Sequence, residues 1–169
     1  MIIYKCLISN DEMFTDAYKM TETKDGMFYK VEGKIITRKK DDIDGKLLGA
    51  NPSAEEETVV VDESSVSGPD IVLNHNLVAM NFNKKNLKIQ MKNNVKAIKA
   101  HLEETNPEKV EKFMADMLAA FATILENFEE YTFYLGETMS TDGMVALLGY
   151  DDSTPYMLFF KDCLVIEKY

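Results

Sequence analysis

The chain has 169 residues, 46% of them hydrophobic, so it is long enough to bury one substantial core, and we expect a single domain spanning residues 1–169. Its net charge of −10 argues against general nucleic-acid binding. No apolar run approaches the roughly 18–20 residues of a membrane span, and the opening MIIYKCLISNDE is not that of a signal peptide, which predicts a cytoplasmic protein.

The first forty residues contain three apolar or alternating runs that favour β-strands. These runs are residues 1–8, 27–31 and 34–38. Glu32-Gly33 separates the last two, so we expect them to pair as a tight hairpin. After the first strand, Ser9 or Asn10 is placed to cap a short turn through residues 11–14.

Residues 39–68 are mostly acidic, rich in serine and interrupted by Gly and Pro, which predicts a long mobile loop. Between residues 41 and 63 there are eight acids and one base. Only residues 58–61 are apolar enough to pair transiently with a sheet.

The acidic segment raises the question of calcium binding. An EF-hand is excluded, because placing Gly45 at the sixth loop position puts Lys40 first and Asn51 last, where acids are required. Clustered oxygen ligands can still bind calcium weakly, and the alternative is a solvated run of charge. The candidate calcium ligands are Asn51, Glu55, Glu56, Glu57, Asp62 and Glu63.

Residues 70–73 are interpreted as a further strand, after which the apolar residues recur every three or four positions, as on one helical face. That face comprises Leu87, Met91, Val95, Ile98 and Leu102. Residues 103–105 form a short connection, and Asn106-Pro107-Glu108 is typical of a helix start. The period continues to Phe128, so we expect an antiparallel helical hairpin over about 84–128.

Lysines form a second stripe on the first of these helices, and residues 83–102 contain no acid. The stripe is either the solvated side of an amphipathic helix or a basic surface for an acidic partner, whose binding would be sensitive to salt. Its members are Lys84, Lys85, Lys88, Lys92, Lys96 and Lys99.

The last forty residues return to β patterns, with turn signals at residues 141–143 and 151–155. The predicted strands are residues 131–135, 144–150, 156–161 and 163–168. The order of strands, loop, helical hairpin and strands predicts an α+β fold, with helices segregated from a mainly antiparallel sheet.

No catalytic motif is visible, so we predict a protein that is not an enzyme. Phosphate-binding glycine loops are absent, and His75 and His101 have no serine or cysteine partner nearby in sequence. Each histidine is interpreted as solvated or hydrogen-bonded. Cys6 and Cys163 lie in apolar runs without a Cys-x-x-Cys motif, which predicts neither a zinc site nor a disulfide framework.

Several blocks of the chain closely resemble a known family, the translationally controlled tumour proteins, over essentially the whole length. LLGANPSAEE resembles the first family signature and YTFYLGETMSTDGMVALLGY the second. The blocks MIIYKCLISNDEMFTD, GPDIVLNH and TPYMLFFKD are also similar to family segments. The resemblance implies an Mss4-like twisted β core, a protruding helical hairpin and a long mobile acidic loop.

The resemblance also implies a function. It suggests a non-enzymatic cytoplasmic protein, secreted in some settings, that binds calcium and microtubules and is linked to growth control and to apoptosis-regulating partners. A second implied role is regulation of a small GTPase such as Rheb, with Glu12 facing the GTPase. Many family members end in a cysteine used for covalent dimers, whereas this chain ends in Tyr169, so no disulfide dimer is expected through that residue.

Overall fold

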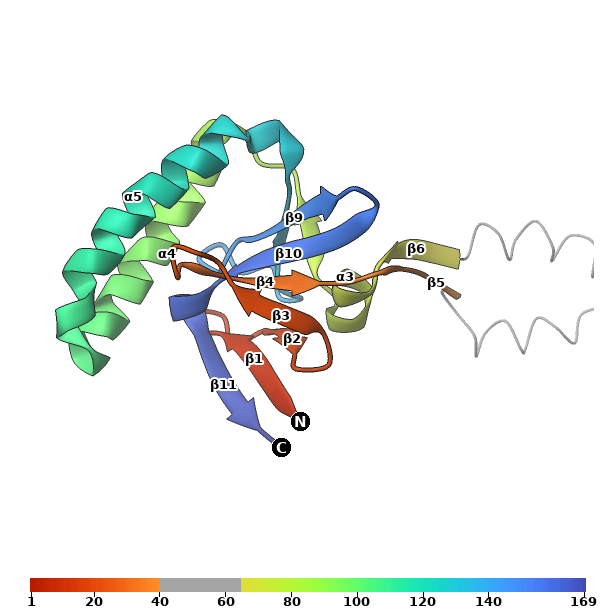
Figure 1. The fold of residues 1–169 in the computed structure, drawn as a ribbon, viewed down its shortest axis with the longest axis horizontal. Coiled ribbons are helices and arrows are strands. Elements are labelled where there is room, and N and C mark those ends of the chain that lie inside the picture. Colours follow the sequence, from red (N-terminus) through yellow and green to blue (C-terminus); the bar gives the residue numbers. More distant parts are fainter. Residues whose placement is uncertain (40–64) are drawn as a thin grey trace, which may run out of the picture.

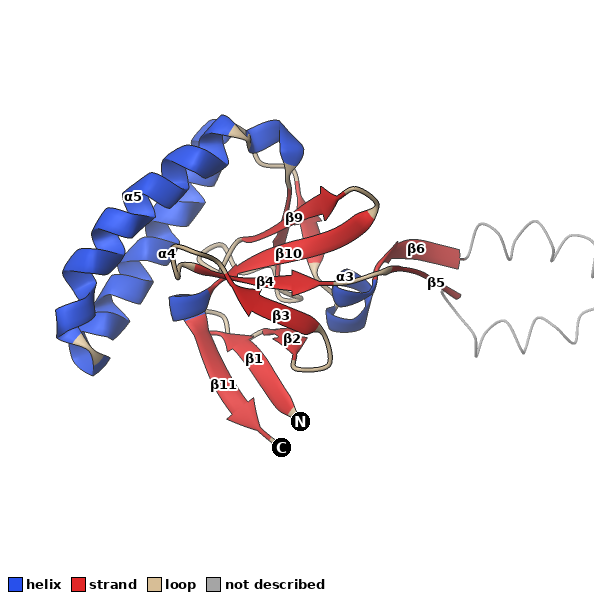
Figure 2. Ribbon diagram, viewed as in Figure 1, coloured by secondary structure: helices blue, strands red, loops and turns tan. Residues whose placement is uncertain are grey.

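The computed structural model describes residues 1–39 and 65–169 (Figure 1). Their strands form three sheets with antiparallel pairing, in the orders β3-β4-β10-β9-β8-β7, β11-β1-β2 and β5-β6. The strands are β1 (Ile2–Cys6), β2 (Glu12–Thr15), β3 (Lys19–Glu22), β4 (Phe28–Glu32), β5 (Ile35–Lys39), β6 (Ser65–Pro69), β7 (Val78–Met80), β8 (Thr132–Leu135), β9 (Ala146–Asp151), β10 (Thr154–Phe160) and β11 (Leu164–Lys168). The predicted mainly antiparallel α+β fold is confirmed (Figure 2).

Strand β10 lies inside the large sheet, between β9 and β4. Its alternate residues Met157 and Phe159 are fully buried, and Met157 is opposite Val31 on β4 and Leu148 on β9. These cross-strand apolar pairs stabilise the middle of the sheet. The three-stranded sheet joins the same core through Phe14, whose ring stacks on Tyr4 at 4.5 Å and lies 4.6 Å from Phe159.

The helical hairpin consists of α4 (Lys84–Thr105) and α5 (Val110–Glu126), joined by Asn106 and the short 3₁₀ turn η1 (Pro107–Lys109). The Asn83 side chain caps α4 by accepting the N–H of Asn86 at 2.7 Å. The hairpin was predicted, but the expected connection at residues 103–105 is wrong, because α4 continues through those residues. In Figure 1 the hairpin lies at one side of the sheets and β5–β6 projects at the other.

The predicted strand over residues 70–73 is also wrong, since these residues belong to the helix α3 (Asp70–His75). A run of three apolar residues, 71–73, has too little periodicity to separate a strand from a helix. The helix begins where Asp70 Oδ1 accepts the N–H groups of Lys34 and Ile71, at 3.0 and 2.9 Å. It ends at Asn76, which has the left-handed φ of 55° that commonly terminates helices.

The predicted hairpin around Glu32-Gly33 is wrong, although both strands exist. β4 pairs with β3 and β10, whereas β5 pairs with β6. The reason is visible at the junction, where Gly33 N–H donates to the Pro155 carbonyl at 2.9 Å instead of closing a turn. Gly33 also has no room for a side chain, because a Cβ would clash with Asp70 Oδ1 and lie 3.2 Å from Ile71 Cδ1.

Several predicted boundaries also need correction. The turn expected at residues 11–14 is largely strand β2, and residues 154–155 belong to β10 rather than to a turn. The loop predicted over 39–68 is too wide at both ends, because β5 extends to residue 39 and β6 begins at residue 65. The end of β5 was predicted one residue short, whereas β6 was missed because Val66 is its only large apolar residue. Residues 58–61 lie outside the described residues.

Candidate functional site

Glu12, the candidate GTPase contact, lies at the start of β2 and is held by a histidine from α3. The His75 Nδ1 atom is 2.9 Å from Glu12 Oε2, and the side chains are 6% and 41% exposed respectively. Because a carboxylate only accepts hydrogen bonds, Nδ1 carries the hydrogen. His75 was predicted to be solvated or hydrogen-bonded, and it is hydrogen-bonded. Its pairing with Glu12 was missed, because the two residues are 63 positions apart.

The hydrogen bonds continue on the far side of the imidazole. Tyr18 Oη is 3.1 Å from His75 Nε2, and the Asn74 amide donates to Tyr18 Oη at 2.9 Å. Arg38 in turn donates to Asn74 Oδ1 and, at 3.3 Å, to the Leu73 carbonyl. A continuous chain of side chains from β5, α3, the segment between β2 and β3, and β2 itself therefore orients the Glu12 carboxylate.

Beside Glu12 the surface forms a polar hollow with a cavity volume of about 440 Å³. The lining residues are Ile3, Lys5, Asn10, Asp11, Glu12, His75, Asn76, Glu137, Thr138 and Tyr169. Asp11 is buried and accepts the Thr138 hydroxyl at 2.7 Å. A Cβ on Gly136 would lie 2.4 Å from Asp11 Oδ2, so the hollow requires a glycine there.

Polar groups also define the rim of this hollow. Asn76 donates to Glu137 at 3.1 Å, and Lys5 forms an ion pair with Glu167 at 2.9 Å. Glu12 and Glu137 both line the hollow. Among the described residues, no group of three or more His, Cys, Asp or Glu side chains could hold a metal ion.

The lysine face of α4, defined as Lys84, Lys85, Lys88, Lys92, Lys96 and Lys99, is exposed along its whole length, as the stripe pattern predicted. Within residues 1–39 and 65–169, none of these six side chains takes part in an ion pair. Lys5, Lys19, Lys30, Lys109, Lys112 and Lys161, by contrast, each have a carboxylate partner. The positive charge of the lysine face is therefore not neutralised by the described body.

A groove between α4 and α5 adjoins the lysine face and has a cavity volume of about 470 Å³. Its lining is Ile89, Lys92, Asn93, Val95, Lys96, Met114, Met117, Leu118 and Phe121. Leu118 is 75% exposed and Ile89 53%, which is unusual for large apolar side chains on a helix. Two methionines of α5, Met114 and Met117, also line this groove, although Met117 is buried.

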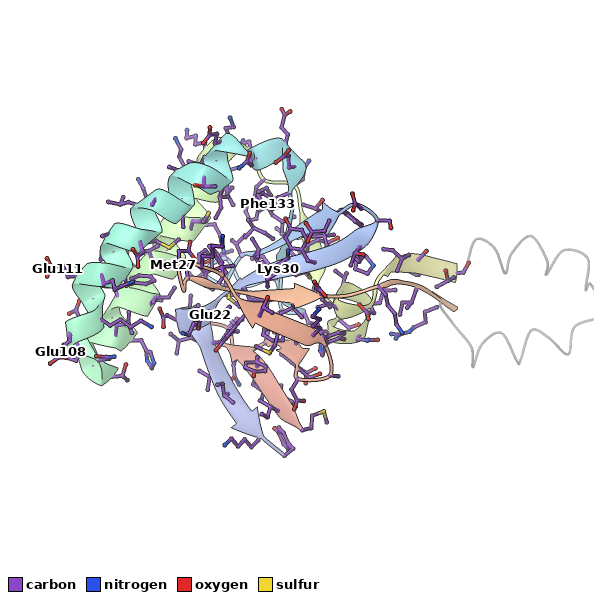
Figure 3. The ribbon with its side chains drawn as sticks, viewed as in Figure 1. Glu22, Met27, Lys30, Glu108, Glu111 and Phe133 are labelled. Carbon is purple, nitrogen blue, oxygen red and sulfur yellow. The ribbon has the colours of Figure 1, made fainter. Side chains whose placement is uncertain are left out.

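The charge on α5 differs from that on α4. Glu108 and Glu111 lie near the tip of the hairpin, where Figure 3 labels them. Acids at a helix start are favoured by the helix dipole, so they belong to the stability of α5. The charge pattern of the hairpin therefore differs in sign between its two parts, with lysines along α4 and acids at the start of α5.

The remaining predicted site residues cannot be placed. Asn51, Glu55, Glu56, Glu57, Asp62 and Glu63 lie outside the described residues, so the calcium site stays a prediction. In the parts of the chain that the structure describes, no helix has the length and hydrophobicity to cross a membrane. Tyr169, the last residue of the chain, donates its hydroxyl to Glu167 at 2.6 Å.

Comparison with known proteins supports the resemblance seen in the sequence. The family model described as translationally controlled tumour protein matches residues 1–165. The chain is 55% identical to the translationally-controlled tumor protein homolog of Lateolabrax japonicus and 53% identical to that of Xenopus laevis, with 99% of each chain covered.

Solved structures of the same family have the same fold. The protein p23fyp of Schizosaccharomyces pombe superposes with a TM-score of 0.82 at 41% identity, covering 100% of both chains. The Caenorhabditis elegans protein superposes with a TM-score of 0.76 at 31% identity, covering 100% of this chain and 99% of that one. Sequence and fold together show that this chain belongs to the translationally controlled tumour protein family.

Proposed function

We propose that this protein is a non-enzymatic cytoplasmic binding protein, and that its lysine face docks on acidic surfaces such as the tails of tubulin. The observation that carries the proposal is the set of six exposed lysines that form no ion pair among the described residues. Because these charges lie on a single helix, an extended acidic chain can contact several of them at once.

Two properties of the binding follow. Contacts between exposed charges are screened by salt, so binding should weaken steeply between low and physiological ionic strength. The neighbouring groove adds apolar contact through Leu118 and Ile89, which salt does not screen. Binding that persists at high salt would therefore depend on the groove more than on the lysines.

The test is microtubule co-sedimentation at low salt with matched charge reversals. We expect the wild-type chain to pellet with microtubules and the variant Lys88→Glu/Lys92→Glu/Lys96→Glu to stay in the supernatant. The control Lys24→Glu/Lys34→Glu/Lys168→Glu changes the net charge equally at exposed lysines away from α4 and should still pellet. Unchanged pelleting of the first variant would remove the lysine face from the mechanism.

We propose regulation of a small GTPase as the second candidate function. It is favoured by the Glu12 carboxylate, which His75 orients at 2.9 Å beside a polar hollow of about 440 Å³. A carboxylate brought close to a bound Mg²⁺ competes for the ion and loosens the nucleotide that it holds.

Nucleotide release from purified Rheb distinguishes this function. We expect release to rise with the wild-type chain and to return to its basal rate with Glu12→Ala. The control Glu129→Ala removes an exposed carboxylate far along the chain and should behave as wild type. Equal release with Glu12→Ala and wild type would exclude the proposed role of Glu12.

Calcium binding, and roles in growth and with apoptosis-regulating proteins, are part of the same proposal and rest on the family resemblance. The candidate ligands are the oxygens of the acidic segment, and calcium accepts such ligands in flexible arrangements. Calorimetric titration with calcium should show weak binding that is reduced in Glu55→Gln/Glu56→Gln/Glu57→Gln. Identical titration curves for the two chains would place any calcium site elsewhere.

A further inference from the structure

Two buried cysteines, which no proposed function uses, are in contact where two strands meet. Cys6 ends β1, and Cys163 immediately precedes β11, which pairs with β1. The Leu7 N–H donates to the Cys163 carbonyl at 2.8 Å, which fixes the two segments side by side. Both residues are free thiols, 1% and 0% exposed, and their side chains are hydrogen-bonded to each other.

The two sulfur atoms have unequal surroundings. Cys6 Sγ accepts the backbone N–H groups of Ser9 and Met144, each at 3.4 Å. The hydrogen bond from Cys163 and these further donors lower the pKa of Cys6 to about 5, against the effect of burial. The same contact, together with burial, raises the pKa of Cys163. The two pKa shifts have opposite directions, so Cys6 is the sulfur of the pair that more readily becomes the thiolate.

This arrangement differs from that of an ordinary core cysteine. A buried cysteine in apolar surroundings stays protonated and inert, whereas a thiolate is the nucleophilic form. A second thiol in contact with the thiolate is placed to resolve an oxidised sulfur before it reacts further. The pair thus has both chemical components of a redox-active dithiol.

Because the sulfur of Cys6 is buried, its reaction requires a local opening of the structure. The turn at residues 7–10 directly follows Cys6, and its members are half-buried or exposed. That turn is held by Asn10 N–H on the Cys6 carbonyl at 2.9 Å, by Ser9 N–H on the Cys6 sulfur and by Leu7 N–H on the Cys163 carbonyl at 2.8 Å. Because the turn lies at the surface, we expect it to open locally without unfolding of the strands that it joins.

We propose that Cys6 and Cys163 form a peroxide-reactive dithiol site that closes to an intrachain disulfide. The Cys6 thiolate attacks one oxygen of hydrogen peroxide, the O–O bond breaks, and hydroxide leaves and takes up a proton to become water. The Cys163 sulfur then attacks the Cys6 sulfenic acid, and the Cys163 proton leaves with the sulfenic hydroxyl as a second water. The two sulfurs lose two electrons in total, and the two peroxide oxygens gain them.

The test begins with the full chain in the reduced state. After a limited dose of hydrogen peroxide, free thiols are alkylated in denaturant and the digest is analysed by mass spectrometry. We expect a cross-linked peptide pair that contains Cys6 and Cys163, lighter by two hydrogen atoms, and its disappearance after treatment with dithiothreitol. Full alkylation of both cysteines after peroxide, under conditions in which the urea-unfolded chain is oxidised, would overturn the proposal.

Single substitutions separate the two roles. In Cys163→Ser the Cys6 sulfenic acid has no resolving thiol, so a dimedone adduct should accumulate at Cys6. In Cys6→Ser the remaining thiol lacks the Ser9 and Met144 donors that Cys6 has, and its oxidation should be about tenfold slower or more. Circular dichroism establishes that both variants are folded. Equal oxidation rates for Cys6 in Cys163→Ser and for Cys163 in Cys6→Ser would contradict the assignment of Cys6 as the nucleophile.

Discussion

Asn94 and His75 are both buried polar residues with distant hydrogen-bond partners, but their surroundings differ. Asn94 on α4 bonds only to backbone, donating to the carbonyls of Asp142 and Gly143 at 3.1 and 2.9 Å and accepting the Val145 N–H at 3.0 Å. His75 bonds only to side chains, of which Glu12 borders an open hollow.

The comparison separates a polar group that holds the fold from one that borders the candidate site. Asn94 is 0% exposed and its partners cannot rotate away, so it locks the segment before β9 onto the hairpin. The partners of His75 are rotatable side chains, so Glu12 can change its contacts when a ligand enters the hollow. A buried side chain whose hydrogen bonds all go to backbone groups indicates a structural role. A buried side chain whose hydrogen-bonded partner reaches solvent indicates a candidate binding site.

Asn94→Ala should give the largest loss of stability. Val145 N–H and the Asp142 carbonyl lose their side-chain partner, although Gln90 still donates to the Gly143 carbonyl at 2.8 Å. We expect a loss of about 3 kcal/mol in the free energy of unfolding, measured by urea denaturation. The neighbouring Asn93→Ala, on the groove side, should change it by less than about 0.5 kcal/mol. Similar losses for the two variants would undermine the comparison.

Gly136→Ala should have the next largest effect, because it damages the floor of the hollow. The added Cβ would lie 2.4 Å from Asp11 Oδ2, so Asp11 or the strand end must move. Overpacking of this kind costs about 2 kcal/mol, measurable in the same denaturation experiment. Gly68→Ala is the control, since a Cβ there has nothing within 4 Å. A neutral Gly136→Ala would show that the hollow is more adaptable than its hydrogen bonds indicate.

His75→Ala should cost less, about 1–2 kcal/mol, because solvent can reach part of the site and rehydrate Glu12. A double-mutant cycle with Glu12→Ala should give a coupling energy of about 0.5–1 kcal/mol. The same cycle with His75→Ala and Glu129→Ala should give a coupling energy of zero within error. A zero coupling between His75 and Glu12 would mean that the histidine does not orient the carboxylate.

The smallest effect concerns alkaline pH and Tyr131, a half-buried phenol. Burial is the main cause that raises the pKa of Tyr131 to about 12, followed by the charge of Tyr156 and a hydrogen bond with it. The unfolded chain loses this proton near pH 10, so the contribution of Tyr131 to stability is complete below pH 10 and is lost towards pH 12. Thermal unfolding of Tyr131→Phe should therefore depend less on pH between 10 and 12. A slope equal to that of wild type would show that Tyr131 titrates normally.

Pattern-based prediction succeeded where one element carries its own long signal. α4 and α5, with 22 and 17 residues, have enough turns for the 3.6-residue period to appear, and the lysine face follows from the same period. The short helix α3 has six residues and no such period, so it was mistaken for a strand. Strand partners were missed at Glu32-Gly33, because pairing with β10 is decided far along the chain.

The candidate sites follow the same rule. Each lysine of α4 is visible as a member of a local stripe, whereas Glu12 and His75 meet only because β2 and α3 pack together. Glu12 itself was indicated by family resemblance and not by any local pattern. Cys6 and Cys163 were each interpreted correctly as residues of apolar runs, and only the pairing of β1 with β11 brings them together.

The β5–β6 pair has a practical consequence for protein engineering. Lys39 and Ser65 are cross-strand partners, so the chain leaves and re-enters the described body at points about 5 Å apart (Figure 1). A two-residue Asn-Gly turn can connect two strand ends at this separation. A foreign sequence can also be inserted between Lys39 and Ser65. A chain in which the Asn-Gly turn joins Lys39 to Ser65 would retain the lysine face, the Glu12 hollow and the dithiol. Each of these features could then be assayed without the acidic segment.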